Sequence, residues 1–392
     1  MRVNILPPDD ARRILPALAA SASSDVWVHR YEHPATGWVL AVATHAPPGS
    51  GHLSLGGFRI APETRTSAPG FTPEREAIAL AMGMEEKVRW SRVLGIGGPL
   101  ARRDLSRVVG GKCVLAPTPD ARIGEPNDRA LLDFAIEAFH AIEASAGIRL
   151  VTGQDLGHGM MSDGLTGSLA YLNARYRGSV VADTSGPTAE GNFQVLHGML
   201  RAAGVPMDRA TVALIGCGNI GMHLVERLRA LHATLVVVEA RAERRHQLEA
   251  LGIRAVGPER KAEVLRDAVD AVVVNAAGAS LDDVTVEAIA ANPRTTVVCG
   301  SENLAMPDPA GVEVLRRAQK SYCPTELGGM MGYLTAVEEY LAKADGVPFE
   351  VATVMRAAAV LEPVAYAGTR VQREGGFARS FEASVIELPA ER

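Results

Sequence analysis

The pattern between residues 211 and 300 places the strongest constraint on the fold of this chain. Four apolar runs, "TVALIG", "ATLVVVEA", "AVVVNAAG" and "TTVVCG", alternate there with helical segments. Continuous apolar strands separated by helices are typical of a parallel sheet that is covered on both faces. The region therefore predicts an α/β domain built on a parallel sheet.

A glycine motif follows the first of these runs. In "GCGNIG", Gly216, Gly218 and Gly221 have the spacing G-x-G-x-x-G, with a strand before the motif and a helical run after it. Gly216 would allow a tight turn, Gly218 would let the backbone approach a pyrophosphate, and Gly221 would let helix and strand pack closely. The motif in this context predicts a Rossmann-type dinucleotide site.

A carboxylate stands at the end of the second run. Glu239 lies 23 residues after Gly216, which suits hydrogen bonds from the adenosine ribose hydroxyls and would repel a 2′-phosphate. NAD is therefore predicted over NADP. Arg241, Arg244 and Arg245 follow closely and could hold such a phosphate, which leaves NADP open as an alternative.

Composition limits the class of protein. With 392 residues, 47% of them apolar, two domains with separate cores are expected. The net charge is −5 without a basic block, which argues against nucleic acid as a partner. No run reaches the roughly 18 apolar residues of a membrane span. Four scattered cysteines and a start unlike a signal peptide favour a cytoplasmic protein without disulfides or structural zinc.

The first half of the chain has a mixed pattern. "VWVHRYEH" and "GWVLAVATHA" predict a hairpin that turns at "PATG", and "GHLSLGGFRIAP" predicts a strand broken by two glycines. Residues 72–90 predict a helix capped by Thr72, and residues 91–107 are expected to form a loop or insertion.

One lysine interrupts a small, apolar run. "VVGGKCVLAP", residues 108–117, predicts a buried strand in which Lys112 follows two glycines. Burying an ammonium costs several kcal/mol unless it is paired or loses its proton. Lys112 is therefore either a functional amine or a surface lysine at the edge of a strand.

The order of the motifs resembles that of the Glu/Leu/Phe/Val dehydrogenase family, the NAD(P)-dependent amino-acid dehydrogenases, from about residue 38 to 345. The segments that carry the resemblance are "LGGFR", "MEEK", "GGKCVLAP", "QDLG", "SGPTAEG", "AAGASLDD" and "CGSENL". The resemblance implies an N-terminal α/β substrate-binding and oligomerisation domain (1–185) and a Rossmann-type NAD-binding domain (186–335), with a cleft between them. It also implies C-terminal helices (336–392) that return to the first domain.

The resemblance implies roles for individual residues. Lys112 would be the general acid/base that activates water, and Asp155 would exchange protons with the amino group. Lys87 and the backbone of Gly56 and Gly57 would bind the substrate carboxylate. The residues expected to bind the cofactor are Thr188, Gly216, Gly218, Asn219, Ile220, Gly221, Glu239, Ala276, Ala277 and Asn303, the last of which would also position the substrate.

The implied reaction is the reversible oxidative deamination of an L-α-amino acid to a 2-oxo acid and ammonia, with NAD as the hydride acceptor. A homo-oligomer is expected, and no metal, nucleic acid or membrane is expected to take part. Two alternatives remain. The chain could be a related oxidoreductase that acts on an unusual amino acid or imine in a specialised pathway, or a catalytically inactive nucleotide-binding homologue.

The chain departs from the family pattern between its two lysines. Lys87 and Lys112 are 25 residues apart, which is farther than the family's usual spacing. A gapless alignment would place Pro99 at the catalytic position, and the dehydrogenase mechanism would then be lost. The gapped alignment, with Lys112 in that position, is preferred because "GGKCVLAP" continues into a strand and helix as the family does.

Two further departures concern side chains near the predicted site. Glu326 stands in "ELGG" where the family has asparagine, and His158 follows "DLG" where threonine is usual. Asp155, His158 and Asp163 have a spacing at which a metal site is conceivable, but the family needs no metal and the three residues lie in a glycine-rich loop.

Overall fold

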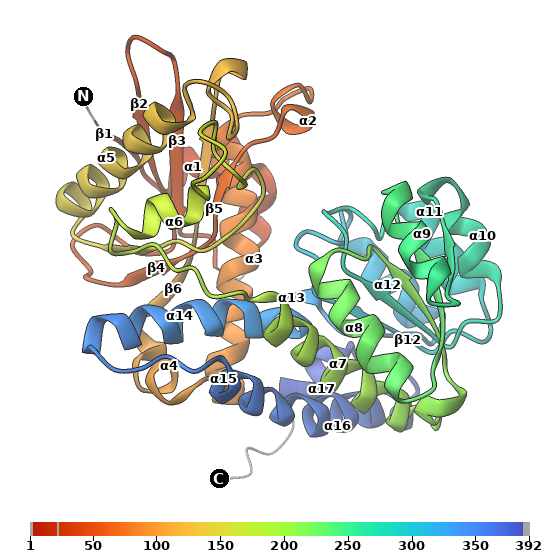
Figure 1. The fold of residues 1–392 in the computed structure, drawn as a ribbon. Helices are drawn as coiled ribbons and strands as arrows, with labels where there is room; N and C mark the ends of the chain where they lie inside the picture. Colours follow the sequence, from red (N-terminus) through yellow and green to blue (C-terminus); the bar gives the residue numbers. More distant parts are fainter. Residues whose placement is uncertain (1–2, 22, 387–392) are drawn as a thin grey trace. The chain divides into compact units, whose positions relative to one another are not determined.

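The computed structural model describes residues 3–21 and 23–386. The chain forms two compact units, shown with the chain order in colour in Figure 1. Unit 1 consists of Met1–Asp183 and Tyr333–Glu350, and unit 2 consists of Thr184–Gly332 and Val351–Arg392. The domain boundary expected after residue 185 therefore lies two residues from the first boundary between the units.

Unit 1 is built on a mixed sheet of seven strands in its described residues, with the order β1-β2-β3-β6-β4-β7 and β5 also paired to β6. The strands are β1 (Val3–Leu6), β2 (Trp27–Glu32), β3 (Val39–Thr44), β4 (Leu53–Leu55), β5 (Phe58–Ile60), β6 (Val108–Ala116) and β7 (Arg149–Val151). The predicted hairpin is confirmed, because β2 and β3 are antiparallel and Trp27 pairs with Thr44. β4 and β5 both run parallel to β6.

Helices cover both faces of this sheet. The helical segments of unit 1 are α1 (Pro8–Ile14), η1 (Pro16–Ala20), α2 (Glu63–Thr66), α3 (Pro73–Leu94), α4 (Pro99–Asp104), η2 (Leu105–Arg107), η3 (Pro119–Ala121), α5 (Asp128–Ala146), α6 (Ser168–Asn173) and most of α14 (Met330–Asp345). Leu40 and Leu115 pack with α5 on one face, whereas Ala43 and Val114 pack with α3 and α1 on the other. Because side chains alternate along a strand and Lys112 pairs with Ala43, the Lys112 side chain belongs to the α3 face.

Residues 91–107, expected to form a loop or insertion, are mostly helical, so the expectation of a loop is wrong. Helix α3 continues to Leu94, and α4 begins at Pro99, whose ring suits a first helical position. The Glu338 carboxylate, from α14, accepts hydrogen bonds from the backbone N–H groups of Leu100 (3.1 Å) and Ala101 (2.7 Å). It therefore satisfies two of the donors that a helix N-terminus leaves unpaired.

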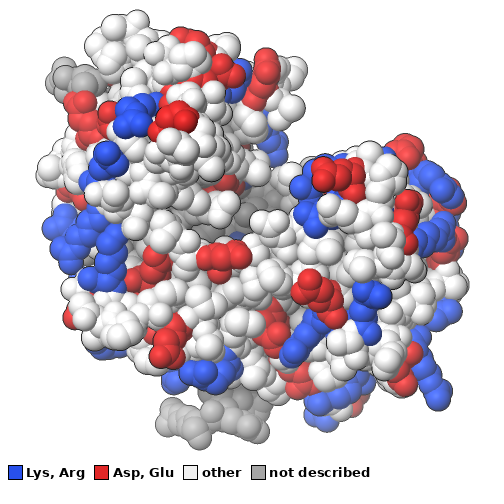
Figure 2. All heavy atoms as spheres, viewed as in Figure 1, with Lys and Arg blue, Asp and Glu red and all other residues white. Residues whose placement is uncertain are grey.

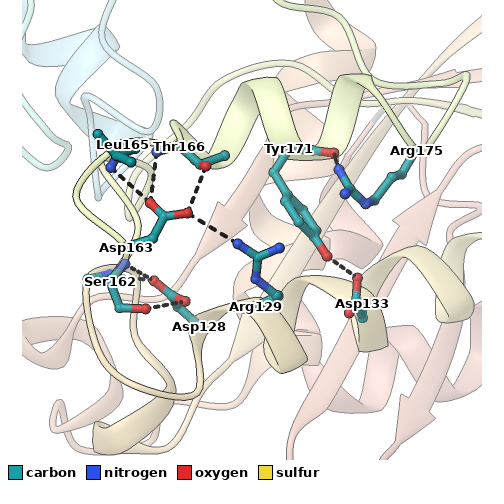
Figure 3. A network of polar contacts seen from close by, with 10 residues as sticks. Asp128, Arg129, Asp133, Ser162, Asp163, Leu165, Thr166, Tyr171 and Arg175 are labelled. Carbon is teal, nitrogen blue, oxygen red and sulfur yellow. Dashed lines mark hydrogen bonds and ion pairs between the residues drawn. The ribbon is translucent and has the colours of Figure 1, made fainter.

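A polar network fixes the long loop between β7 and α6 to helix α5 (Figure 3). Asp128, in the first turn of α5, accepts hydrogen bonds from the Ser162 N–H (2.6 Å) and hydroxyl (3.0 Å). Asp163 accepts from the Thr166 N–H at 2.8 Å and pairs with Arg129 at 3.1 Å. These contacts hold a glycine-rich segment whose first residues belong to the predicted site.

Unit 2 is built on a parallel sheet in the order β10-β9-β8-β11-β12-β13, as its alternating sequence pattern predicts. The strands are β8 (Thr211–Ile215), β9 (Thr234–Val238), β10 (Arg254–Val256), β11 (Ala271–Val274), β12 (Val297–Gly300) and β13 (Ser321–Tyr322). This order places the strand before the glycine motif next to the point where the strand order reverses, which is where dinucleotides bind in such sheets.

The helical segments of unit 2 are α7 (Ser185–Ala202), η4 (Met207–Arg209), α8 (Asn219–Ala230), α9 (Ala242–Ala250), η5 (Pro258–Arg260), α10 (Lys261–Arg266), α11 (Asp283–Ala291), α12 (Ala310–Arg317), α13 (Thr325–Gly328), α15 (Val351–Ala357), η6 (Ala358–Val360), α16 (Leu361–Glu374) and α17 (Phe381–Ile386). Residues 336–392 were expected to return to the first domain as a whole, but only the part up to Glu350 does so. The remainder belongs to unit 2 because α16 packs on α7, where Arg201 pairs with Glu362 at 2.8 Å and lies over the Tyr366 ring.

Acidic and basic side chains are interspersed over most of the face drawn in Figure 2, in keeping with the small net charge of −5. Within the described residues, none of the helices is both long enough and apolar enough to span a membrane.

Candidate active site and nucleotide-binding turn

Unit 1 brings together the two residues predicted to be catalytic. The Lys112 ammonium, from β6, forms an ion pair with the Asp155 carboxylate, which lies beyond the end of β7. The Lys112 side chain is only 4% exposed and that of Asp155 12% exposed. Lys112 is therefore a buried, paired amine and not a surface lysine at a strand edge.

A second cation shares the same carboxylate. Arg59, from β5, donates to Asp155 Oδ1 from Nη2 at 3.1 Å, and its guanidinium also pairs with Glu76 of α3. Burial alone would raise the pKa of Asp155, but the charges of Lys112 and Arg59 outweigh it and hold that pKa well below its usual range. Asp155 is thus a carboxylate that accepts from two cations.

The glycine pair before Arg59 fits tightly around this ion pair. A Cβ on Gly57 would lie 2.9 Å from Lys112 Nζ and 3.2 Å from Asp155 Cβ, so Gly57 lies directly beside the ammonium. A Cβ on Gly56 would instead lie 1.9 Å from the Gly111 carbonyl oxygen, and the Gly56 N–H already donates to the Val151 carbonyl at 3.1 Å. Gly56 therefore lets two strands approach, and Gly57 is the member of the pair that borders the site.

Helix α3 carries the other predicted lysine close to the same strand. Lys87 is 6% exposed, and two residues earlier the Glu85 carboxylate accepts a hydrogen bond from the Gly110 N–H at 2.6 Å. A Cβ on Gly110 would lie 2.2 Å from the Glu85 nitrogen, so the helix backbone packs directly on β6. The "MEEK" and "GGKCVLAP" motifs are therefore adjacent in space. The role of Lys87 in binding a carboxylate remains a prediction.

The structure gives Pro99 a different setting from Lys112. Pro99 is the first residue of α4, and the end of that helix is held by the carboxylate of Glu338. Lys112 is the residue that pairs with Asp155. This geometry favours the gapped alignment, in which residues 95–107 are an added helical segment.

His158 and Asp163 have structural partners. The His158 Nε2 lies 2.7 Å from the Phe58 carbonyl oxygen and its Nδ1 lies 3.1 Å from the Ser168 hydroxyl. Burial lowers the pKa of His158, so the ring is neutral and holds the loop to β5. Asp163 belongs to the network of Figure 3, and in the described residues no group of three His, Cys, Asp or Glu side chains is placed to hold a metal ion.

In unit 2, the glycine motif forms the turn that its spacing predicts. Gly216 has φ +85°, a conformation that favours glycine, and a Cβ there would lie 2.6 Å from the Ala276 backbone. A Cβ on Gly221 would lie 2.8 Å from the Gly216 carbonyl oxygen, which confirms the close packing of helix on turn. A Cβ on Gly218 would meet no described atom within 4 Å, so the loop has open space at the start of α8, where a pyrophosphate would approach.

Glu239 lies beside this turn. Its carboxylate accepts hydrogen bonds from the N–H groups of Cys217 and Arg241, both at 2.8 Å, and is 6% exposed. Burial would raise the pKa of Glu239, but these bonds and the Arg241 guanidinium lower it, so the group is an anion. Arg245 donates to the backbone carbonyls of Glu239 and Ala240, whereas Arg241 is 58% exposed beside the carboxylate. The guanidinium of Arg241 thus lies beside the predicted ribose contact.

The other predicted cofactor residues also belong to unit 2. Ala276 and Ala277 are exposed after β11, and Asn219 and Ile220 begin α8. Thr188 is buried in α7, where its hydroxyl donates to the Thr184 carbonyl at 2.7 Å. Asn303 is half-buried two residues beyond Ser301, and Glu326 is half-buried in α13.

Sequence reasoning missed several polar residues at both sites. In unit 2, the buried Glu302 accepts from the Ala276 and Ser280 N–H groups, both at 2.9 Å, and Asn275 accepts from Asn192 at 2.8 Å. In unit 1, the missed residue is Arg59. The sequence feature that could have identified Arg59 is a charged residue within the otherwise apolar strand "FRI", directly after the glycine pair.

Part of the chain is similar in sequence to a known amino-acid dehydrogenase. The chain is 28% identical over 295 residues to a valine dehydrogenase from Streptomyces virginiae, an alignment that covers 73% of each protein. No protein-family model matches the chain.

Solved structures with the same fold include L-tryptophan dehydrogenase from Nostoc punctiforme, with a TM-score of 0.61 and 18% identity over 91% of this chain and 92% of that one. A hetero-hexameric glutamate dehydrogenase from Thermus thermophilus has a TM-score of 0.61 and 16% identity over 98% of this chain and 86% of that one. These structures confirm the expected α/β fold with a Rossmann-type domain. The match to a valine dehydrogenase confirms the resemblance to the amino-acid dehydrogenases.

Proposed function

We propose that the protein catalyses the NAD-dependent, reversible oxidative deamination of an L-α-amino acid to a 2-oxo acid and ammonia. The observation that carries the proposal is the buried Lys112–Asp155 ion pair beside Gly57, in the segments whose order matches the family. The likeness to a valine dehydrogenase supports the same reaction class. It also supports a substrate with an amino group on a carbon that bears a carboxylate.

The residues of unit 1 supply positioning and proton transfer. Lys87 and the backbone at Gly57 would bind the substrate carboxylate. Lys112 would take a proton from the water that attacks the α-carbon, and Asp155 would exchange protons with the departing amino group. A nicotinamide cofactor supplies the hydride acceptor. The turn at Gly216–Gly221 and the carboxylate of Glu239 are the residues that would hold it.

The preference for NAD is the finer part of the proposal. It is supported by the ionised Glu239 at the end of β9, because a carboxylate there accepts from ribose hydroxyls and repels a 2′-phosphate. A homo-oligomer is also proposed, as an expectation from the family resemblance. Size-exclusion chromatography with light scattering would test it.

The test is a panel of the common L-amino acids with NAD and with NADP at alkaline pH, monitored as reduced cofactor. We expect turnover with at least one amino acid and faster turnover with NAD. Lys112→Ala should lower kcat by roughly 10²–10⁴, the usual contribution of a positioned proton-transfer residue. Lys112→Arg should not restore it, because a guanidinium does not give up its proton in this range.

Failure of every amino acid in the panel, with cofactor binding intact by calorimetry, would exclude the proposed reaction on common substrates. It would favour either the oxidoreductase with an unusual substrate or the inactive homologue.

A further inference from the structure

We propose that Arg59 is a positioning residue whose charge sets how strongly Asp155 holds the proton of Lys112, and the inference rests on the function proposed above. The observation behind it is a row of four buried, alternating charges within unit 1. Glu76 pairs with Arg59, Arg59 pairs with Asp155, and Asp155 pairs with Lys112. Arg59 comes from β5 and Lys112 from β6, Asp155 lies beyond the end of β7, and Glu76 comes from α3.

The row is built into the core of the unit. Arg59 and Lys112 share the α3 face of the sheet, since Arg59 pairs in register with Val114, two residues along β6 from Lys112. The side chain of Arg59 is 5% exposed and that of Glu76 is 12% exposed. Solvent therefore screens these charges weakly, and each acts strongly on its neighbour.

The proposed reaction places two opposing requirements on the Lys112–Asp155 pair. Lys112 has to release its proton to act as a base, but a lone carboxylate in contact with it would hold that proton. Arg59 remains protonated throughout, so it takes up part of the carboxylate's charge and weakens the hold of Asp155 on the ammonium. It also keeps Asp155 ionised once Lys112 is neutral. Glu76 opposes this effect by neutralising part of the Arg59 charge.

Other titratable groups lie on β6, on α3 and in the loop beyond β7. Burial lowers the pKa of His158, which is therefore neutral, and burial raises the pKa of the Cys113 thiol to about 12. On α3, the Glu85 carboxylate accepts a hydrogen bond from the Gly110 N–H and burial raises the pKa of Glu85, and Lys87 lies on the same helix. These side chains are present in every variant compared below.

The test compares Arg59→Gln, Arg59→Lys and Glu76→Gln by the pH dependence of kcat/KM. Arg59→Gln should move the rising limb of the profile up by about one pH unit, the lower end of the effect of a neighbouring charge. Glu76→Gln should move it in the opposite direction, by about half as much. Arg59→Lys keeps the charge, so its profile should stay close to that of the wild type. A purely structural role would not give shifts of opposite sign.

Arg30→Gln is the matched control. Arg30 also pairs with a glutamate of α3, Glu74, at 2.8 Å, but its contacts do not include Asp155. This variant should leave the pH profile unmoved. Thermal unfolding of all variants would identify any that are merely unfolded.

A second readout does not require turnover. The chain has five lysines, so the ¹³Cε resonance of Lys112 in ¹³C-lysine-labelled protein can be assigned with Lys112→Arg. Its titration midpoint should rise in Arg59→Gln and fall in Glu76→Gln. Unmoved midpoints, or shifts of the same sign, would overturn the inference even in an active enzyme. If every amino acid fails as a substrate but the midpoints move as stated, the proposed function falls and the charge relation stands.

Discussion

Replacing Gly57 with alanine tests whether the buried ammonium takes part in the reaction. The added Cβ would lie 2.9 Å from Lys112 Nζ, whereas ordinary contacts begin near 3.4 Å. The far end of a lysine is flexible, so the ammonium would move by about 0.5–1 Å and the fold would remain. A misplacement of about 1 Å can cost about 10²-fold in rate. We therefore expect Gly57→Ala to lose about 10²-fold in kcat.

Gly56→Ala is the matched comparison. Its Cβ would meet the Gly111 carbonyl oxygen at 1.9 Å and the Lys112 Cα at 2.8 Å, and these backbone atoms can move only if the strands separate. Overpacking of a core typically costs about 1–3 kcal/mol, and this contact belongs at or above the upper end. Urea unfolding should therefore show a large loss of stability for Gly56→Ala and a small one for Gly57→Ala.

Steady-state kinetics and urea unfolding of both variants would test these expectations for kcat/KM and for the free energy of unfolding. A wild-type kcat/KM for Gly57→Ala would refute the role of the ammonium, because the ammonium would then lie elsewhere or take no part in the reaction. Wild-type stability of Gly56→Ala would show that the strands do not approach as closely as described.

Three further predictions address other parts of the molecule. Lys87→Ala should raise KM for the amino acid strongly with some loss of kcat, and unchanged substrate binding would contradict the carboxylate role. Glu239→Ala should lower the ratio of kcat/KM for NAD over NADP, and a wild-type enzyme that uses NADP equally well would refute the assignment. Burial lowers the pKa of His29 to about 4, so its share of stability is complete above about pH 6.5 and is lost as the pH falls towards 4. The free energy of unfolding in urea should be measured at pH 7.5 and at pH 5. The loss of this free energy between the two pH values should be about 2 kcal/mol smaller in His29→Leu than in the wild type. An equal loss in both proteins would show that His29 is not buried as a neutral ring.

The parts of the fold that could be predicted are those with a local cause. The parallel sheet of unit 2 follows from unbroken apolar strands, and the turn at Gly216 follows from a φ that glycine adopts readily. Strands β10 and β13 were not predicted from the sequence, because they are only 3 and 2 residues long and lack an apolar run. Their pairing is decided by neighbouring strands.

The site could be predicted where the order of motifs carried it, as for Lys112 and Asp155. Arg59 was missed because its role in the site depends on ion pairs with Glu76 and Asp155, which lie close to it only in the folded protein. The helical character of residues 99–104 was missed for a similar reason. The carboxylate that caps that helix belongs to Glu338, which is remote in the sequence.

The path of the backbone has a practical consequence for protein engineering. The chain passes between the two units three times, after Asp183, Gly332 and Glu350, so neither unit corresponds to one uninterrupted gene segment. A hybrid enzyme that exchanges only residues 184–392 would also replace Glu338 and Glu339, which hold α4 and the Val181 and Ala182 N–H groups within unit 1. A functional transplant of the nucleotide-binding half must therefore splice at all three junctions and leave residues 333–350 with their original host.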